Sequence, residues 1–125
     1  MHLTAWITLA ALAVYGWTFF AAGRARVAYK VEAPSMDGPP EFLRAMRVQA
    51  NTLEQLPLLL APLWLCAWFL GDAWAAAGGA VWCVGRIMYA LAYAKFPPSR
   101  AAGFVIALIG SGGLMAGTAA GLLLR

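Results

Sequence analysis

Four long apolar runs, separated by short polar or proline-rich segments, make up almost the whole chain. The first run, residues 3–23, contains no charged residue, and about 20 apolar residues suffice for a helix to cross the hydrocarbon core of a membrane. The breaks are the segment EAPSMDGPP at residues 32–40, the pair Gly71-Asp72 and the segment KFPPSR at residues 95–100. Proline and glycine disfavour the continuation of a helix, so each break ends a run. The pattern predicts four membrane-spanning helices, over about residues 3–30, 41–70, 73–94 and 99–124.

The composition favours a membrane protein and excludes most other classes. Hydrophobic residues make up 63% of the 125 residues and charged residues only 11%, whereas soluble domains are roughly half apolar and about a quarter charged. Intrinsic disorder needs the opposite composition. Cys66 and Cys83 lie inside apolar runs and His2 stands alone near the terminus, so we expect neither a disulfide framework nor a metal site. The predicted fold class is all-α: residues 1–125 form one domain, an integral membrane four-helix bundle.

Basic residues are concentrated beside the first and third breaks. The members of these clusters are Arg24, Arg26, Lys30, Arg44, Arg47, Lys95 and Arg100. On the opposite side of a four-span protein, Arg125 is the only arginine or lysine. Basic clusters that flank apolar runs orient a protein with its positive side toward the cytoplasm, and they do not form the continuous basic surface that binds nucleic acid. We expect loops one and three to be cytoplasmic, with no nucleic-acid partner. The short chain, rich in alanine and glycine, suggests a bacterial inner membrane.

Two stripes of polar side chains interrupt the apolar pattern of the second and third predicted helices. Residues on one face of a helix recur every three or four positions, which is the spacing within each stripe. The stripes consist of Arg47, Asn51 and Glu54 on the second helix and of Arg86, Tyr89 and Tyr93 on the third. Charged groups inside a membrane are costly and usually functional. Arg100 follows one turn past the end of the third helix, so these side chains are expected to meet near one membrane face.

Simpler roles remain open for several members of the stripes. Tyr89 and Tyr93 would suit the aromatic belt at a membrane interface, and Arg86 would suit a structural ion pair with Glu54. If the stripes form one site, their chemistry limits its ligand. Arginines bind carboxylates, a carboxylate binds an ammonium group, and amide and phenol side chains bind peptide groups. A small zwitterionic peptide such as glutathione satisfies all of these groups, while a phospholipid headgroup would also satisfy the arginines.

Three motifs resemble one family of membrane proteins. They are GPPEF at residues 38–42, RVQANTLEQLP at residues 47–57 and GRIMYALAY at residues 85–93, with Arg100 following at the family's spacing. Together they resemble the membrane-associated proteins in eicosanoid and glutathione metabolism (MAPEG), over roughly residues 24–104. The resemblance implies four-helix subunits that assemble as a homotrimer. It also implies that glutathione, as co-substrate, binds between neighbouring subunits near one membrane face, without a metal.

The resemblance implies a role for each matching residue. The glutathione-binding residues would be Arg26, Arg47, Gln49, Asn51, Glu54, Tyr89 and Tyr93. Arg100 would be catalytic, because a guanidinium beside the glutathione sulfur would stabilise the thiolate. Gln49 lies about 200° around the helix from Arg47, since each residue turns about 100°. Both can therefore touch one ligand only where two subunits enclose it.

The chain departs from the leukotriene- and prostaglandin-forming branches of that family at Val27, Gln55, Ala101 and Gly112. These departures favour a general glutathione transferase, which joins the glutathione thiolate to a lipophilic electrophile. Peroxidase activity is compatible with the same interpretation. The electrophile would enter from the lipid bilayer, between the first helix and a neighbour's fourth. Two alternatives stay open: a small four-helix multidrug-type transporter that uses Glu54 as its essential carboxylate, and a non-catalytic family member.

Overall fold

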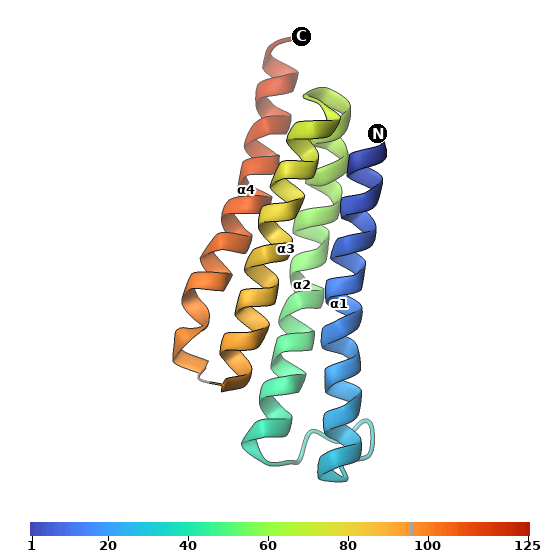
Figure 1. Ribbon diagram of the computed structural model, residues 1–125, viewed down its shortest axis with the longest axis vertical. Coiled ribbons are helices and arrows are strands. Elements are labelled where there is room, and N and C mark those ends of the chain that lie inside the picture. The colour runs from blue at the N-terminus through green and yellow to red at the C-terminus, as the bar shows by residue number, and fades with distance from the viewer. Residues whose placement is uncertain (96) are drawn as a thin grey trace.

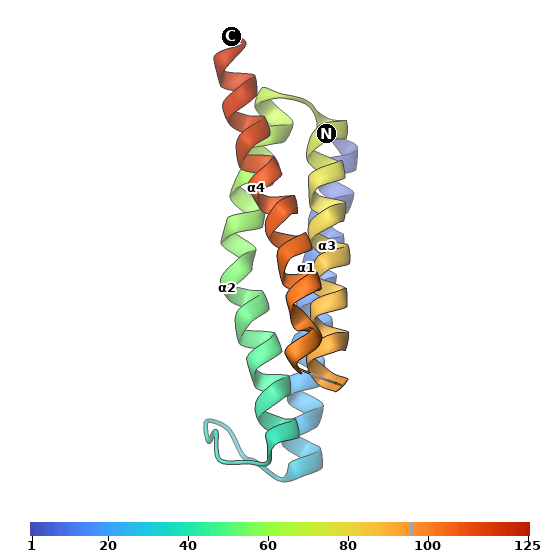
Figure 2. The same ribbon diagram turned by 90° about the vertical axis from the view of Figure 1, so that its left-hand side faces the viewer.

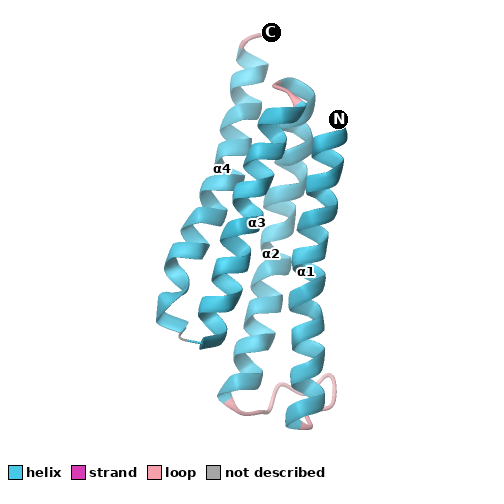
Figure 3. Cartoon of the chain, viewed as in Figure 1, coloured by secondary structure: helices cyan, strands magenta, loops and turns pink. Residues whose placement is uncertain are grey.

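The computed structural model describes residues 1–95 and 97–125, and its regular secondary structure is helical throughout (Figure 3). A short 3-10 helix, η1 (Pro97–Arg100), leads into the last of the long helices. The long helices are α1 (His2–Tyr29), α2 (Pro40–Phe69), α3 (Asp72–Lys95) and α4 (Ala101–Leu123). The all-α four-helix bundle expected from the apolar runs is confirmed for the described residues.

The connection between α3 and α4 differs from the expected loop. The sequence predicts a break at residues 95–100, with one helix ending at about residue 94 and the next beginning at about residue 99, but α3 ends at Lys95 and residues 97–100 form η1. Phe96, inside that predicted loop, lies outside the described residues. A proline lacks the N–H group needed in a helix interior, yet it fits the first turn of a helix. The proline pair that breaks the sequence pattern can therefore stand at the start of a helical turn, as Pro40 does at the start of α2.

Successive helices run in opposite directions (Figures 1 and 2). Both termini therefore lie at one end of the bundle, and η1 lies with the connection between α1 and α2 at the other end. We call the end with these two connections the basic end, because the clustered arginines and lysines of the sequence belong to it. The helix α4 packs mainly on α3 and also contacts α2, whereas α1 packs against α2 and α3.

All four long helices are long and apolar enough to cross a membrane. Their outward faces carry large apolar side chains: Trp68 and Trp74 are each 68% exposed, and Phe20 is 73% exposed. Soluble monomers rarely expose apolar surface on this scale, whereas lipid or a second subunit would cover it. The exposed faces are therefore those of a multi-pass membrane protein, in which the bilayer surrounds the bundle.

Glycines bring α3 and α4 into close contact. A Cβ atom added to Gly103 would lie 2.7 Å from the carbonyl oxygen of Gly85, and one added to Gly110 would lie 2.7 Å from the backbone nitrogen of Trp82. Backbone atoms cannot move aside as a flexible side chain can, so these helix crossings need glycine. Gly112, by contrast, has nothing within 4 Å of its added Cβ position. The small residues of α4 therefore serve helix packing where they face α3, and Gly112 does not take part.

Asp72 ties the start of α1 to the start of α3. Its carboxylate accepts hydrogen bonds from the backbone nitrogens of Leu3, at 3.1 Å, and Thr4, at 2.8 Å, and from the hydroxyl group of Thr4. The first turn of a helix has N–H groups without partners inside the helix and carries a partial positive charge, so a carboxylate there is stabilising. The sequence does not reveal this contact, because Asp72 and Thr4 are 68 positions apart.

We expect Asp72→Ala to lower the Tm of the detergent-solubilised protein, because the N–H groups at the start of α1 lose their acceptor. Asp37→Ala is the matched control, since Asp37 is an exposed acid in the connection between α1 and α2. Its carboxylate makes no hydrogen bond or ion pair within the described part of the chain. Thermal unfolding of both variants measures the difference, and equal Tm values would show that the Asp72 contact adds no stability.

Candidate functional site

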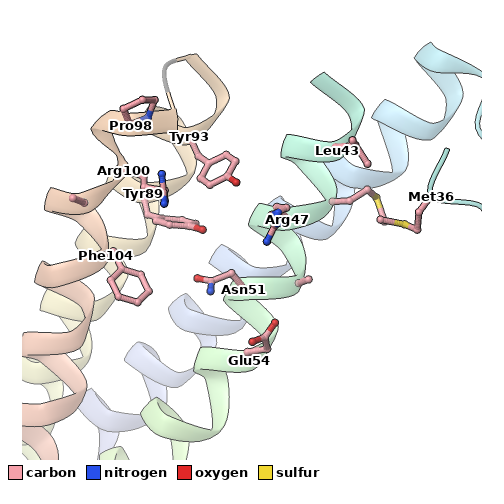
Figure 4. A pocket seen from close by; sticks show the side chains of 13 residues that line it. Met36, Leu43, Arg47, Asn51, Glu54, Tyr89, Tyr93, Pro98, Arg100 and Phe104 are labelled. Atoms are coloured by element: carbon pink, nitrogen blue, oxygen red, sulfur yellow. The ribbon is translucent and has the colours of Figure 1, made fainter. Parts of the chain in front are cut away.

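A cavity of about 990 Å³ opens between α2, α3 and the start of α4 at the basic end (Figure 4). Of the predicted site residues, the structure brings together Arg47, Asn51, Glu54, Tyr89, Tyr93 and Arg100 in its lining. They belong to three separate segments of the chain. The fold therefore joins the polar stripes of α2 and α3 with the arginine that follows them.

One wall of the cavity is the polar face of α2. Arg47, Asn51 and Glu54 follow one another along this face (Figure 4). Arg47 and Glu54 are exposed, and Asn51 is half-buried. Since a helix rises 1.5 Å per residue, the backbone positions of Arg47 and Glu54, at the two ends of this wall, lie about 10 Å apart along the helix axis. The wall presents a cation, an amide and an anion in one line.

The opposite wall is aromatic and carries a second cation. The ring centroids of Tyr89 and Tyr93 lie 5.5 Å apart, and the Phe104 centroid lies 6.1 Å from that of Tyr89. The guanidinium of Arg100 lies over the Tyr93 ring, 5.5 Å from its centroid. Tyr89 is only 4% exposed. Such burial does not suit an aromatic anchor at lipid headgroups, so Tyr89 forms part of the cavity wall instead.

Arg86 lies behind both walls and is fully buried. Its Nη2 atom donates hydrogen bonds of 2.8 Å to Oδ1 of Asn51 and of 2.8 Å to Oγ1 of Thr52. Its guanidinium also lies 4.2 Å from the centroid of the Tyr89 ring. Across the described ranges, Arg86 and Glu54 form no ion pair, so the structural pair that the sequence left open is not formed. Glu54 lines the cavity, and Arg86 binds neutral acceptors.

Two predicted site residues lie outside this cavity. Arg26 organises the connection between α1 and α2: its Nη1 donates to the carbonyl oxygen of Ser35 at 2.8 Å, and its guanidinium lies 5.4 Å from the centroid of the Phe42 ring. Gln49 faces α1, where its Nε2 donates to the hydroxyl oxygen of Tyr15 at 2.8 Å. A single chain therefore does not bring Arg26 and Gln49 to the other predicted residues.

The sequence alone does not identify the apolar part of the cavity lining. These residues are Met36, Leu43, Met46, Ala50, Pro98, Ala101 and Phe104. In a chain that is 63% hydrophobic, periodicity cannot separate a cavity wall from a lipid-facing surface. The sequence also does not reveal that Thr52 accepts a hydrogen bond from Arg86. The one available signal is its hydroxyl group beside Asn51, because a buried arginine requires such acceptors.

The arrangement suits a small anionic or zwitterionic ligand with peptide groups. Arg47 and Arg100 can bind carboxylates or a thiolate, Glu54 can bind an ammonium group, and Asn51 and the tyrosines can bind peptide groups. The aromatic wall offers surface to an apolar group. In residues 1–95 and 97–125, no three His, Cys, Asp or Glu side chains are grouped as metal ligands would be.

Comparison with known proteins points to one family. Residues 4–120 match the sequence profile of the MAPEG family. An uncharacterized protein of Synechocystis is 42% identical over 105 residues, which are 84% of this chain and 77% of that protein. Microsomal glutathione S-transferase 2 of Homo sapiens is 36% identical over 86 residues, 69% of this chain and 58% of that protein. Leukotriene C4 synthase of Cavia porcellus is 36% identical over 100 residues, 80% of this chain and 67% of that protein.

These matches identify the same family as the resemblance of the motifs on α2 and α3. The match to the human protein spans little more than half of that protein's length, 58%. The family profile, in contrast, covers nearly the whole chain, including all of α2 and α3 and most of α1 and α4. This chain belongs to the MAPEG family.

Proposed function

We propose that this protein is a membrane glutathione transferase, which joins the sulfur of glutathione to a lipophilic electrophile. The observation that carries the proposal is one cavity in which three chain segments place two cations, a carboxylate, an amide and two phenols. A relative named as a glutathione S-transferase supports the same chemistry. The departures at Val27 and Gly112 from the leukotriene-forming branch favour a general transferase over leukotriene synthesis.

The α2 wall matches the charges and the length of a zwitterionic tripeptide. An extended peptide of three residues spans about 10 Å, which is also the rise along the helix from Arg47 to Glu54. Glu54 would bind the ammonium group of glutathione, and Arg47 would bind a carboxylate. Asn51, between them, would donate a hydrogen bond to a peptide carbonyl.

Arg100 would activate the sulfur. A free thiol has a pKa of about 8.5, so only a few percent of it is thiolate at neutral pH. A neighbouring guanidinium lowers such a pKa by about 1–3 units, because it favours the charged form. The thiol gives its proton to water, and the thiolate then forms a carbon–sulfur bond with the electrophile. With an aromatic halide, the halide ion leaves with the electron pair of its bond to carbon.

We further propose that the working unit is a homotrimer in which glutathione lies between subunits. In a single chain, Arg26 and Gln49 lie away from the cavity, and the outward helix faces are strongly apolar. Packing between copies would cover part of those faces and bring Arg26 and Gln49 of one subunit to the cavity of the next. Light scattering of the detergent-solubilised protein tests this, and a monomeric mass together with full glutathione binding would contradict it.

The cavity would open toward the cytoplasm, at the inner membrane of a bacterium. It lies at the basic end of the bundle, and membrane proteins place their basic connections in the cytoplasm. The cytoplasm is also the compartment in which glutathione is kept as a thiol. A reporter fused after Arg125 should therefore lie outside the cytoplasm, and a cytoplasmic reporter would reverse the proposed orientation.

Glutathione added to the detergent-solubilised protein in weak buffer near pH 7 should release protons, because the bound thiol ionises. A cationic lipophilic drug should release none. Proton release with the drug alone would instead favour the transporter, in which Glu54 would titrate. An assay with an aromatic halide then distinguishes a glutathione transferase from a family member that binds glutathione without catalysis. Proton release without conjugation would identify a non-catalytic family member.

A further inference from the structure

We infer that Arg86 is a positioning residue for glutathione recognition: it orients the amide of Asn51 and supports the ring of Tyr89 from behind the cavity. The inference rests on the proposed function, because glutathione is the ligand concerned. Arg86 does not line the cavity itself, while Asn51 and Tyr89 do. It therefore acts through these two residues, which belong to different helices.

The contact with Arg86 decides which end of the Asn51 amide faces the ligand. A guanidinium only donates hydrogen bonds, so only the oxygen of the amide can face it. Nη2 of Arg86 donates to Oδ1 of Asn51 at 2.8 Å. The amide nitrogen Nδ2, at the other end of the planar group, is therefore directed away from Arg86. Since Asn51 lines the cavity (Figure 4), Nδ2 is the donor it offers to a carbonyl or carboxylate of the ligand.

Thr52 holds the same guanidinium nitrogen from a second direction. Its hydroxyl group donates to the carbonyl oxygen of Val48 at 2.7 Å and accepts from Nη2 of Arg86 at 2.8 Å. Because the hydroxyl proton is directed toward Val48, the oxygen offers a lone pair to Arg86. Two neighbouring acceptors on α2 thus fix a cation that α3 carries. The orientation of the Asn51 amide is set by this contact between two helices.

The guanidinium also supports the opposite wall and adds positive charge behind the cavity. It lies 4.2 Å from the centroid of the Tyr89 ring, within the range of a cation–π contact. Its Nε and Nη1 atoms are buried without a hydrogen-bond partner in the described part of the chain, and no carboxylate there pairs with it. A buried cation without a counter-charge is costly, so an anion in the adjoining cavity would offset part of that cost. Arg86 therefore favours an anionic ligand as well as an oriented amide.

Glutathione affinity, measured by calorimetry on the detergent-solubilised protein, tests the inference. Arg86→Lys keeps the charge, but its shorter side chain ends before the position of Nη2, from which Arg86 donates to Asn51 and Thr52, and it lacks the planar group that lies over the Tyr89 ring. We expect Arg86→Lys and Asn51→Ala each to weaken binding by about 10- to 100-fold, the range for a hydrogen bond that involves a charged group. The double variant should bind no more weakly than the weaker single variant, because both changes remove the same oriented donor.

Cys83→Ala is the matched control, because Cys83 is a buried residue one turn before Arg86 and does not line the cavity. This variant should lose stability and keep its glutathione affinity. The double variant Arg86→Lys, Asn51→Ala can instead lose affinity by the product of the two single-variant factors. In that case Asn51 acts without Arg86, and the inference is overturned, although the proposal of glutathione binding stands. If the unaltered protein binds no glutathione, the proposed function fails and this inference fails with it.

Asn51→Asp keeps the test decisive if Arg86→Lys does not fold. The new carboxylate would pair with Arg86, so the Tm should be higher than that of Asn51→Ala. The variant lacks the Nδ2 donor, so it should bind glutathione at least about tenfold more weakly than the unaltered protein. A Tm no higher than that of Asn51→Ala, or an affinity equal to that of the unaltered protein, would overturn the inference.

Discussion

Arg100→Ala is expected to lower the conjugation rate at pH 7 by about 10- to 30-fold through the ionisation of the glutathione sulfur alone. If the guanidinium lowers the thiol pKa by about 1–3 units, between roughly a quarter and nearly all of the bound thiol is thiolate at this pH. Without that charge the fraction is about 3%. Arg100 lines the cavity and lies over the Tyr93 ring, so its charge is held where a ligand would bind.

The loss should depend on pH in a defined direction. As the pH rises toward about 9, the glutathione thiol ionises without the help of Arg100. The conjugation rate of Arg100→Ala should therefore approach that of the unaltered protein. Arg100→Lys keeps a positive charge and should retain more activity. Arg125→Ala is the matched control, because Arg125 lies over Phe69, 4.8 Å from the ring centroid, at the opposite end of the bundle.

Thiolate formation can be followed by its ultraviolet absorbance as glutathione is titrated into the protein, beside the rate with an aromatic halide. Both signals should fall together in Arg100→Ala. If the thiolate absorbance of this variant equals that of the unaltered protein, another group activates the sulfur and the catalytic role assigned to Arg100 is wrong.

Gly103→Ala is expected to lower the free energy of unfolding by about 1–3 kcal/mol, the range for an added methyl group in a well-packed interior. The new Cβ would meet the backbone of Tyr89 and lie 2.7 Å from the carbonyl oxygen of Gly85. Since backbone cannot move aside, α3 and α4 would have to separate. Tyr89 lines the cavity, so the same substitution should also weaken glutathione binding.

Gly112→Ala provides the control on the same helix. Nothing lies within 4 Å of the Cβ that it adds, and alanine favours a helix over glycine by about 1 kcal/mol. Its Tm should therefore be unchanged or slightly higher, and its glutathione affinity should be unchanged. Thermal unfolding and calorimetry on both variants make the comparison. An equal loss of Tm in Gly103→Ala and Gly112→Ala would show that the close approach at Gly103 contributes nothing.

The residues that share a helix face could be predicted from the sequence, because an α-helix has one pitch and the spacing of residues determines their direction. Arg47, Asn51 and Glu54 therefore line one cavity together, as their spacing requires. The same reasoning separates Gln49 from Arg47, and Gln49 is found against Tyr15 on the other side of α2. The number of helices follows as directly, since the length and apolarity of each run suffice to cross a membrane.

Contacts between helices could not be predicted in this way. They depend on the rotation of each helix about its axis and on how closely two backbones approach, and neither leaves a periodic signal in a chain that is apolar almost throughout. Only the tertiary structure shows that Arg86 reaches Asn51 and Thr52 instead of Glu54. It alone shows that Asp72 holds the start of α1.

The class of fold, the number of spans and the two polar faces follow from the sequence, because they depend on local composition and on the helical repeat. Which faces meet, which charge is buried and which polar groups face the cavity follow from the packing of the helices. These outcomes depend on atoms that are far apart in the chain and close together only after the helices have packed.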